Sequence, residues 1–152
     1  MKLFLDTDIL IDKLANRQPF VEEVKQLCIA KYFGDVSLHV SVQSYLDAMF
    51  VLRKFASEKE LRRRAIASLN FFDVVDVEQR NLVPALQSDW SDVEDFMIAK
   101  TAEDNNANFL LTRDVQGFKN SKVKVMTPKD FLKFLKDEYS VEYGIECKPL
   151  DF

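Results

Sequence analysis

The chain opens with a short apolar run over residues 2–5 that ends in an acid, Asp6, and is followed by a helical pattern. This feature constrains the fold most, because a short apolar run bounded by polar residues is typical of a buried parallel strand. In open α/β sheets, ligands bind at the carboxyl ends of the strands. A carboxylate at that edge either caps the next helix or binds a hard metal ion, and the choice between these uses decides the function.

The same alternation of short apolar runs and helical patterns continues along the chain. Further strands are expected at 36–42, 73–77, 108–112 and 124–126, and helices at 8–14, 19–33, 44–55, 57–71, 78–87, 91–104 and 127–136. Ser57, Ser91 and Thr127 occupy N-cap positions in this scheme. Strands alternating with helices predict a single three-layer α/β/α domain with a mainly parallel central sheet. We expect this domain over residues 1–137, and a tail over 138–152, with a candidate strand at 140–143, that packs on the domain or binds a partner.

Composition narrows the chemistry open to this domain. The 152 residues carry a net charge of −4, which argues against a protein that coats nucleic acid, and no apolar run could span a bilayer. We therefore expect a cytoplasmic protein without a membrane segment. His39, the only histidine, lies in a strand-like run. Cys28 and Cys147 form no ligand-like pair, and Cys28 is expected in the core because it lies on the apolar face of a predicted helix. No zinc-type cluster or glycine-rich phosphate loop is present, whereas Asp and Glu total 25.

Four acids stand where strands end or helices begin, which is one edge of a parallel sheet. Asp6 and Asp114 follow predicted strands, and Asp47 and Asp95 lie in the first turns of predicted helices. If the first and fourth strands are neighbours, these carboxylates converge and repel one another. A hard cation such as Mg²⁺ or Mn²⁺ would relieve that repulsion and could activate water for phosphodiester hydrolysis.

Each acid also has a structural explanation. Asp47 could complete a capping box with Ser44, Asp95 could interact with the helix dipole, and Asp114 could open a turn. Asp6 is the hardest to explain in this way, because an unpaired acid at the end of a strand is costly. Two further acids, Asp8 and Asp12, suit helix-start or solvent positions, although Asp8 is close enough to reach a metal through water. Taken singly each acid is more often structural, but the four together favour a metal site.

Four segments resemble, in order and spacing, the motifs of PIN-domain ribonucleases, a family that includes VapC-type toxins. They are Leu3–Asp12, Asp92–Ala99, Leu110–Asp114 and Val125–Leu132, so the resemblance covers about residues 2–135. It implies a PIN-like fold and a Mg²⁺- or Mn²⁺-dependent endoribonuclease that cleaves RNA. It also implies two candidate protein partners, an antitoxin and a second copy of the chain.

Position in the sequence and the resemblance together give candidate roles to nine residues. The catalytic acids are Asp6, Asp95, Asp114 and Asp47, of which the first three bind metal; the supporting residues are Thr7, Asp8, Thr112 and Asp92; and the substrate contact is Arg113. The chain departs from the family pattern in two places. The second acid is usually Glu, and Asp47 is shorter by one methylene, so its direct contact with metal is an open question. An acidic residue often precedes the phenylalanine at Phe118, where this chain has Gly117.

Two alternatives remain open at this stage. The first is a PIN-like module that binds RNA or protein without activity, which the departures at Asp47 and Gly117 favour. The second is a haloacid-dehalogenase-like phosphatase, in which Asp6 would be the nucleophile. That reading has less support, because it rests on one short motif and the chain lacks the paired acids expected after a later strand.

Overall fold

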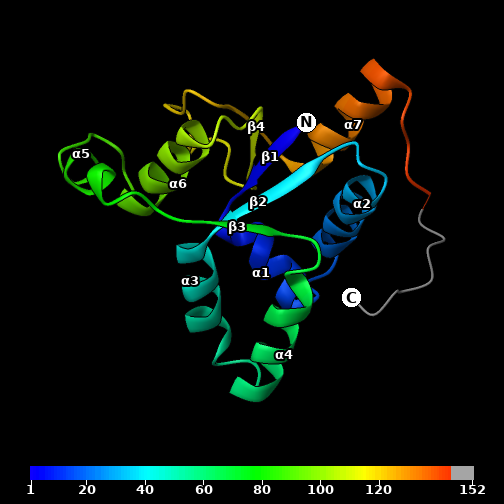
Figure 1. The fold of residues 1–152 in the computed structure, drawn as a ribbon, viewed down its shortest axis with the longest axis horizontal. Helices are drawn as coiled ribbons and strands as arrows, with labels where there is room; N and C mark the ends of the chain where they lie inside the picture. The colour runs from blue at the N-terminus through cyan, green and yellow to red at the C-terminus, as the bar shows by residue number, and fades with distance from the viewer. Residues whose placement is uncertain (145–152) are drawn as a thin grey trace.

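Five short strands form one parallel sheet in the computed structural model, which describes residues 1–144 (Figure 1). The strands are β1 (Lys2–Leu5), β2 (Ser37–Ser41), β3 (Asp73–Val75), β4 (Phe109–Leu111) and β5 (Lys124–Met126). Their order is β3-β2-β1-β4-β5, so β1 lies at the centre. Phe4 is in register with His39 of β2 on one side and with Leu110 of β4 on the other. The predicted contact between the first and fourth strands is therefore confirmed.

Helices cover both faces of this sheet and complete the predicted three-layer arrangement. They are α1 (Thr7–Ala15), α2 (Phe20–Tyr32), α3 (Val42–Leu52), α4 (Glu58–Ser68), α5 (Leu82–Leu86), α6 (Val93–Asp104) and α7 (Pro128–Tyr139). Buried side chains of α1, α2, α3, α4 and α7 share one apolar cluster, whereas those of α6 belong to a second cluster on the other face. In Figure 1, α3 and α4 project away from the sheet as two arms.

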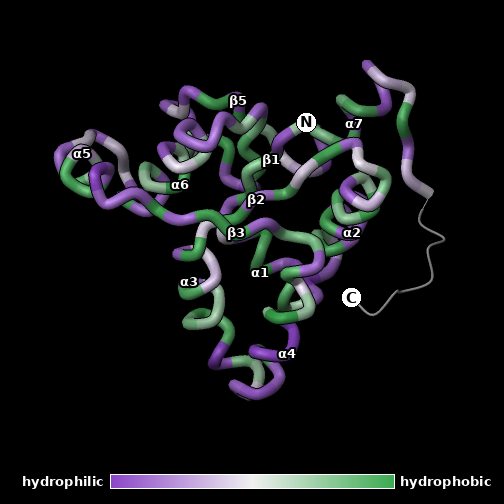
Figure 2. The backbone as a smooth tube through the Cα atoms, in the orientation of Figure 1, coloured by the Kyte–Doolittle hydropathy of each residue, from purple (hydrophilic) through white to green (hydrophobic). Residues whose placement is uncertain are grey.

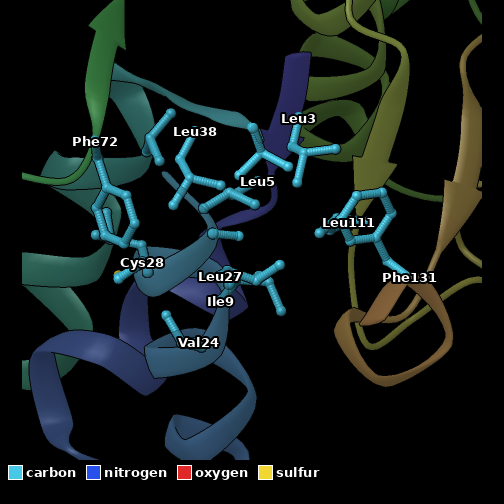
Figure 3. Close-up of a cluster of buried hydrophobic side chains, with 14 of the residues drawn as sticks. Leu3, Leu5, Ile9, Val24, Leu27, Cys28, Leu38, Phe72, Leu111 and Phe131 are labelled. Carbon is cyan, nitrogen blue, oxygen red and sulfur yellow. The ribbon is translucent and has the colours of Figure 1, made fainter. Parts of the chain in front are cut away.

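The apolar run that opens the chain fills both clusters. Leu3 and Leu5 point into the larger cluster, where Figure 3 shows them beside Leu38, and Phe4 points into the smaller one with Leu110. Leu3, Phe4 and Leu5 each have an exposed fraction of 0%. Alternate side chains of a strand face opposite sides, so a central strand with helices on both sides needs consecutive apolar residues. Figure 2 shows the same distribution, with hydrophobic residues along the central strands and hydrophilic ones near the outer end of α4.

Two helices begin at other caps than the sequence suggests. The Ser41 hydroxyl accepts a hydrogen bond from the backbone N–H of Ser44 at 3.0 Å, so Ser41 caps α3 and the helix starts at Val42. Asp47 consequently lies in the second turn, and its explanation as part of a capping box with Ser44 is wrong. At α6 the cap is Asp92, which accepts from the Glu94 N–H at 2.7 Å, and the expected cap at Ser91 is wrong.

The remaining differences lie in the weaker elements. A 3-10 turn (Gln79–Asn81) and the short α5 replace the single helix expected at 78–87, because Pro84 is tolerated only in the first turn of a helix. Residues 141–144 are irregular and not a strand. Cys28 is buried and His39 lies in β2, as predicted, whereas Cys147 lies outside the described residues. None of the helices within residues 1–144 is long and apolar enough to cross a bilayer.

Candidate functional site

Asp6 lies at the carboxyl end of the central strand and is held by two hydrogen bonds. Its Oδ1 accepts from the backbone N–H of Thr7 at 2.6 Å, which makes Asp6 the N-cap of α1, and its Oδ2 accepts from the Thr112 hydroxyl at 2.7 Å. Burial, and then the negative charge of Asp8, raises the pKa of Asp6 to about 8. The two uses foreseen for this acid are therefore compatible. Asp6 caps a helix, and its ionised form still calls for a compensating positive charge.

Thr112 links Asp6 to the loop that follows β4. Its side chain is fully buried, and while its hydroxyl donates to Asp6 it accepts from the backbone N–H of Asp114 at 3.0 Å. The Asp114 carboxylate in turn accepts from the N–H of Gly117 at 3.0 Å, so Asp114 also opens a turn, as its structural explanation foresaw. This chain of bonds fixes Asp114 beside the end of β1.

Asp95 approaches the same place from the other face of the sheet, in the first turn of α6. Gly117 lies between Asp95 and Asp114. A Cβ atom at Gly117 would be 2.6 Å from Asp114 Oδ2 and 3.1 Å from Asp95 Oδ2, so the two carboxylates meet over a residue that has no side chain. Burial, and then the charges of Asp92 and Asp114, raises the pKa of Asp95 to about 6. The family often has an acid at this position, whereas here the Asp95 and Asp114 carboxylates occupy the space that a side chain at position 117 would need.

Asp47 and Glu94 form a second pair of acids beside this group. Gln43 Nε2 donates to both oxygens of Asp47 at 2.9 and 3.0 Å, which turns Asp47 along its own helix. Glu94 accepts from the Thr7 hydroxyl at 3.1 Å. Partial burial, and then the charge of Asp47, raises the pKa of Glu94. The sequence analysis missed Glu94 as a site residue, because acids in the first turn of a helix are ordinarily explained by the helix dipole.

Arg113 is held by acids of α1. Its Nε lies 3.1 Å from Asp12 Oδ2 and 3.6 Å from Asp8 Oδ2, and its guanidinium lies over the Phe20 ring at 4.5 Å from the ring centre. Asp12 is 1% exposed and also pairs with Arg17 at 3.2 Å. The helix-start or solvent position expected for Asp12 is therefore wrong. Asp12 faces the core side of its helix because two guanidinium groups reach it there.

Comparison with known proteins identifies this arrangement. The family model of the PIN domain matches residues 2–116. The chain belongs to the PIN-domain family. The match confirms the predicted PIN-domain family and gives no support to the phosphatase alternative. No curated protein sequence matches the chain.

Solved structures share the fold of this PIN domain. VapBC2 from Rickettsia felis, bound to a promoter DNA fragment, has a TM-score of 0.61 at 15% identity, covering 84% of this chain and 98% of that chain. A toxin–antitoxin complex from Klebsiella pneumoniae has a TM-score of 0.59 at 22% identity, covering 83% and 97%. FitAcB from Neisseria gonorrhoeae has a TM-score of 0.55 at 15% identity, covering 84% and 98%.

The donor atoms at this edge of the PIN domain fit a hard divalent cation in their chemistry. All of them are carboxylate or hydroxyl oxygens, the ligands that Mg²⁺ and Mn²⁺ prefer. Asp8 Oδ1 is buried without a hydrogen-bond partner, and burial, followed by the charges of neighbouring acids, raises the pKa of Asp6 and Asp95. Within residues 1–144, however, no three acidic, histidine or cysteine side chains could hold a metal ion as they stand.

Proposed function

We propose that this PIN domain is a Mg²⁺- or Mn²⁺-dependent endoribonuclease that hydrolyses RNA phosphodiester bonds, and that it is the toxin of a toxin–antitoxin pair acting in the cytoplasm. One observation carries the proposal. Asp6, Asp95 and Asp114 come from three separate elements and lie at the carboxyl edge of β1 and β4, where burial and neighbouring acids raise the pKa of Asp6 and Asp95. The toxin–antitoxin complex among the structural neighbours supports the second part.

In this proposal, Asp6, Asp95 and Asp114 would hold the cation. When bound, such an ion supplies an activated water and stabilises charge on the phosphate oxygens. Two hydrogen bonds fix Asp6, the most buried of the three, and Asp114 at the exposed rim would face the substrate. Thr112 orients both of these acids, and Asp92 caps the helix that carries Asp95.

Three further residues border this centre. The Thr7 N–H orients Asp6, and Asp8 accepts from the backbone N–H of Arg113 at 3.1 Å, which connects α1 to the loop that bears Asp114. Arg113 is retained as a candidate phosphate contact. Because its Nε already pairs with Asp12, the atoms left for a phosphate are the terminal nitrogens of the guanidinium.

RNA cleavage by active-site variants tests the proposal. The wild type, Asp6→Asn and Asp95→Asn are incubated with a mixed RNA pool and Mn²⁺, with Asp137→Asn, an exposed acid on α7, as the matched control. We expect cleavage by the wild type and the control, loss of cleavage in the two site variants, and loss with a chelator that Mn²⁺ reverses. Equal cleavage by all four proteins would refute the nuclease proposal. RNA binding without cleavage by the wild type would instead favour the inactive binding module.

We propose that the antitoxin contacts a cleft between α1, α2 and α4. The cleft has a volume of about 450 Å³, and four cationic residues line it together with apolar side chains: Lys13, Lys25, Arg63, Arg64, Leu14, Val21 and Phe71. Lys25 pairs with Glu22, and Arg63 and Arg64 pair with Glu60. A partner segment with carboxylate and apolar side chains would exchange these ion pairs for its own and pack on the apolar lining. A candidate antitoxin co-expressed with the chain should bind it and suppress cleavage. The charge reversals Lys25→Glu and Arg64→Glu should weaken that complex, and an unchanged affinity would exclude the cleft.

We also propose a homodimer formed through exposed apolar residues of α3 and α5. Leu46 and Phe50 of α3 are 62% and 60% exposed, and Val83 and Leu86 of α5 are exposed to a similar degree. Exposed apolar side chains of this kind are typical of subunit interfaces. Light scattering coupled to gel filtration should give a dimer for the wild type and a monomer for Phe50→Asp. A monomeric wild type at micromolar concentration would refute this assignment.

A further inference from the structure

Thr7 brings two carboxylates to the start of α1. Its backbone N–H donates to Asp6 Oδ1 at 2.6 Å, and its hydroxyl lies 3.1 Å from Glu94 Oε1. The same hydroxyl is 2.9 Å from Ser44 Oγ, and one hydroxyl carries one hydrogen, so Glu94 shares this hydrogen with Ser44. Thr7 therefore connects Glu94 to the anchoring acid, Asp6.

Asp47 is less well placed for the same task. Both of its oxygens accept from Gln43 Nε2, one turn earlier in α3, at 2.9 and 3.0 Å. To reach the position beside Thr7, Asp47 would have to give up these bonds, and its side chain has one methylene fewer than that of Glu94. Glu94 already lies at that position, because the first turn of α6 carries it there beside Asp95.

We propose that Glu94 is a metal-site acid of this PIN domain and acts at the position beside Thr7 that Asp47 does not reach. The proposal rests on the proposed function, since it concerns the same cation. In it, Glu94 would join three other acids as a ligand of the ion: Asp6 from the end of β1, Asp95 from α6, and Asp114 from the loop after β4. Asp47 then influences Glu94 through its charge and does not bind the ion itself.

Electrostatics agrees with this geometry. Burial, and then the charge of the nearby Asp47 carboxylate, raises the pKa of Glu94. Asp47 and Glu94 therefore face each other.

A purely structural Glu94 would only accept the Thr7 hydrogen bond, and Glu94→Gln separates the two roles. Glutamine retains an oxygen that can accept from Thr7 but has no charge to offer a cation. The matched variant is Asp47→Asn on the facing helix, and Asp6→Asn reports on the metal site as a whole. Thermal unfolding without metal checks that each variant is folded.

The measurement is Mn²⁺ affinity, obtained by calorimetry or from the electron paramagnetic resonance signal of free Mn²⁺. We expect Glu94→Gln to weaken Mn²⁺ binding by about tenfold or more, and Asp47→Asn to weaken it by less than about threefold. An unchanged affinity in Glu94→Gln, together with a loss in Asp6→Asn, would overturn the role of Glu94 and leave the metal site intact. A larger effect of Asp47→Asn than of Glu94→Gln would also overturn it. If Asp6→Asn binds Mn²⁺ like the wild type, the proposed nuclease centre itself is wrong, and Glu94 has no metal to bind.

Discussion

The Thr112 hydroxyl is the smallest group that connects two of the site acids, and its removal gives a sharp prediction. In Thr112→Val the side chain keeps its shape, so the packing at this fully buried position is preserved. Two hydrogen bonds are lost, the one donated to Asp6 Oδ2 at 2.7 Å and the one accepted from the Asp114 N–H at 3.0 Å. Asp6 then lies in a site with little access to water, whereas the Asp114 N–H is only partly buried.

The expected cost follows from these two bonds. A buried hydrogen bond to a carboxylate contributes roughly 2 kcal/mol and one to a backbone N–H roughly 1 kcal/mol, so unfolding should become easier by about 3 kcal/mol. For a chain of this length, that loss corresponds to a melting temperature lower by roughly 6–12 °C. The Thr112 bond also lowers the pKa of Asp6, so without it Asp6 ionises less readily and Mn²⁺ should bind more weakly at neutral pH.

Thermal and urea unfolding of the metal-free protein measure this effect. Thr112→Ser is the control, because serine retains the hydroxyl and loses only a methyl group, and it should recover most of the stability. A free energy of unfolding for Thr112→Val within about 0.5 kcal/mol of the wild type would refute the reasoning, since it would mean that Asp6 and Asp114 are held by other contacts.

Three other predictions concern neighbouring residues. The pKa of Asp6 is about 8 in the folded chain and 3.8 in the unfolded chain, so the stabilisation present below pH 4 is lost as the pH rises through 8. The melting temperature of the metal-free protein should therefore fall from pH 5 to pH 8, and Asp6→Asn should make it depend less on pH. Gly117→Ala should turn the Asp114 carboxylate away and weaken Mn²⁺ binding, because the new Cβ would lie 2.6 Å from Asp114 Oδ2; wild-type affinity would contradict this. Burial raises the pKa of Asp12 to about 6 despite Arg113 and Arg17, so burial offsets much of what the two ion pairs contribute. In urea titrations at pH 7, Asp12→Asn should change the free energy of unfolding by less than about 1 kcal/mol. A loss above about 3 kcal/mol would show that the ion pairs dominate.

The elements of the fold could be predicted from the sequence because their causes are local. Consecutive apolar residues at Leu3, Phe4 and Leu5 require a strand buried on both faces, and Thr127 followed by Pro128 starts α7 as expected. Helix starts were less certain. Ser41 and Ser44 are equally good caps in sequence, and the choice depends on where β2 leaves the sheet.

The residues of the candidate site also fall into two groups, those that the sequence indicates and those that only the fold brings together. Asp6, Asp95 and Asp114 were identified from the sequence because each stands where a strand ends or a helix begins, and chain order alone places such positions at one edge of a parallel sheet. The sequence by itself therefore determined the parallel α/β fold and the acids that its strand ends carry.

Only the tertiary structure decided how these acids are held and which other residues join them. Thr112 reaches Asp6 across 106 positions of the chain, and Thr7 reaches Glu94 across 87. Arg113 pairs with Asp12 of α1, and Gly117 leaves the space in which Asp95 and Asp114 meet. These contacts depend on the pairing of β1 with β4 and on the packing of α6 against the opposite face. Neither arrangement leaves a periodic pattern in the sequence, since the side chains involved are brought together by the fold and not by their spacing along the chain.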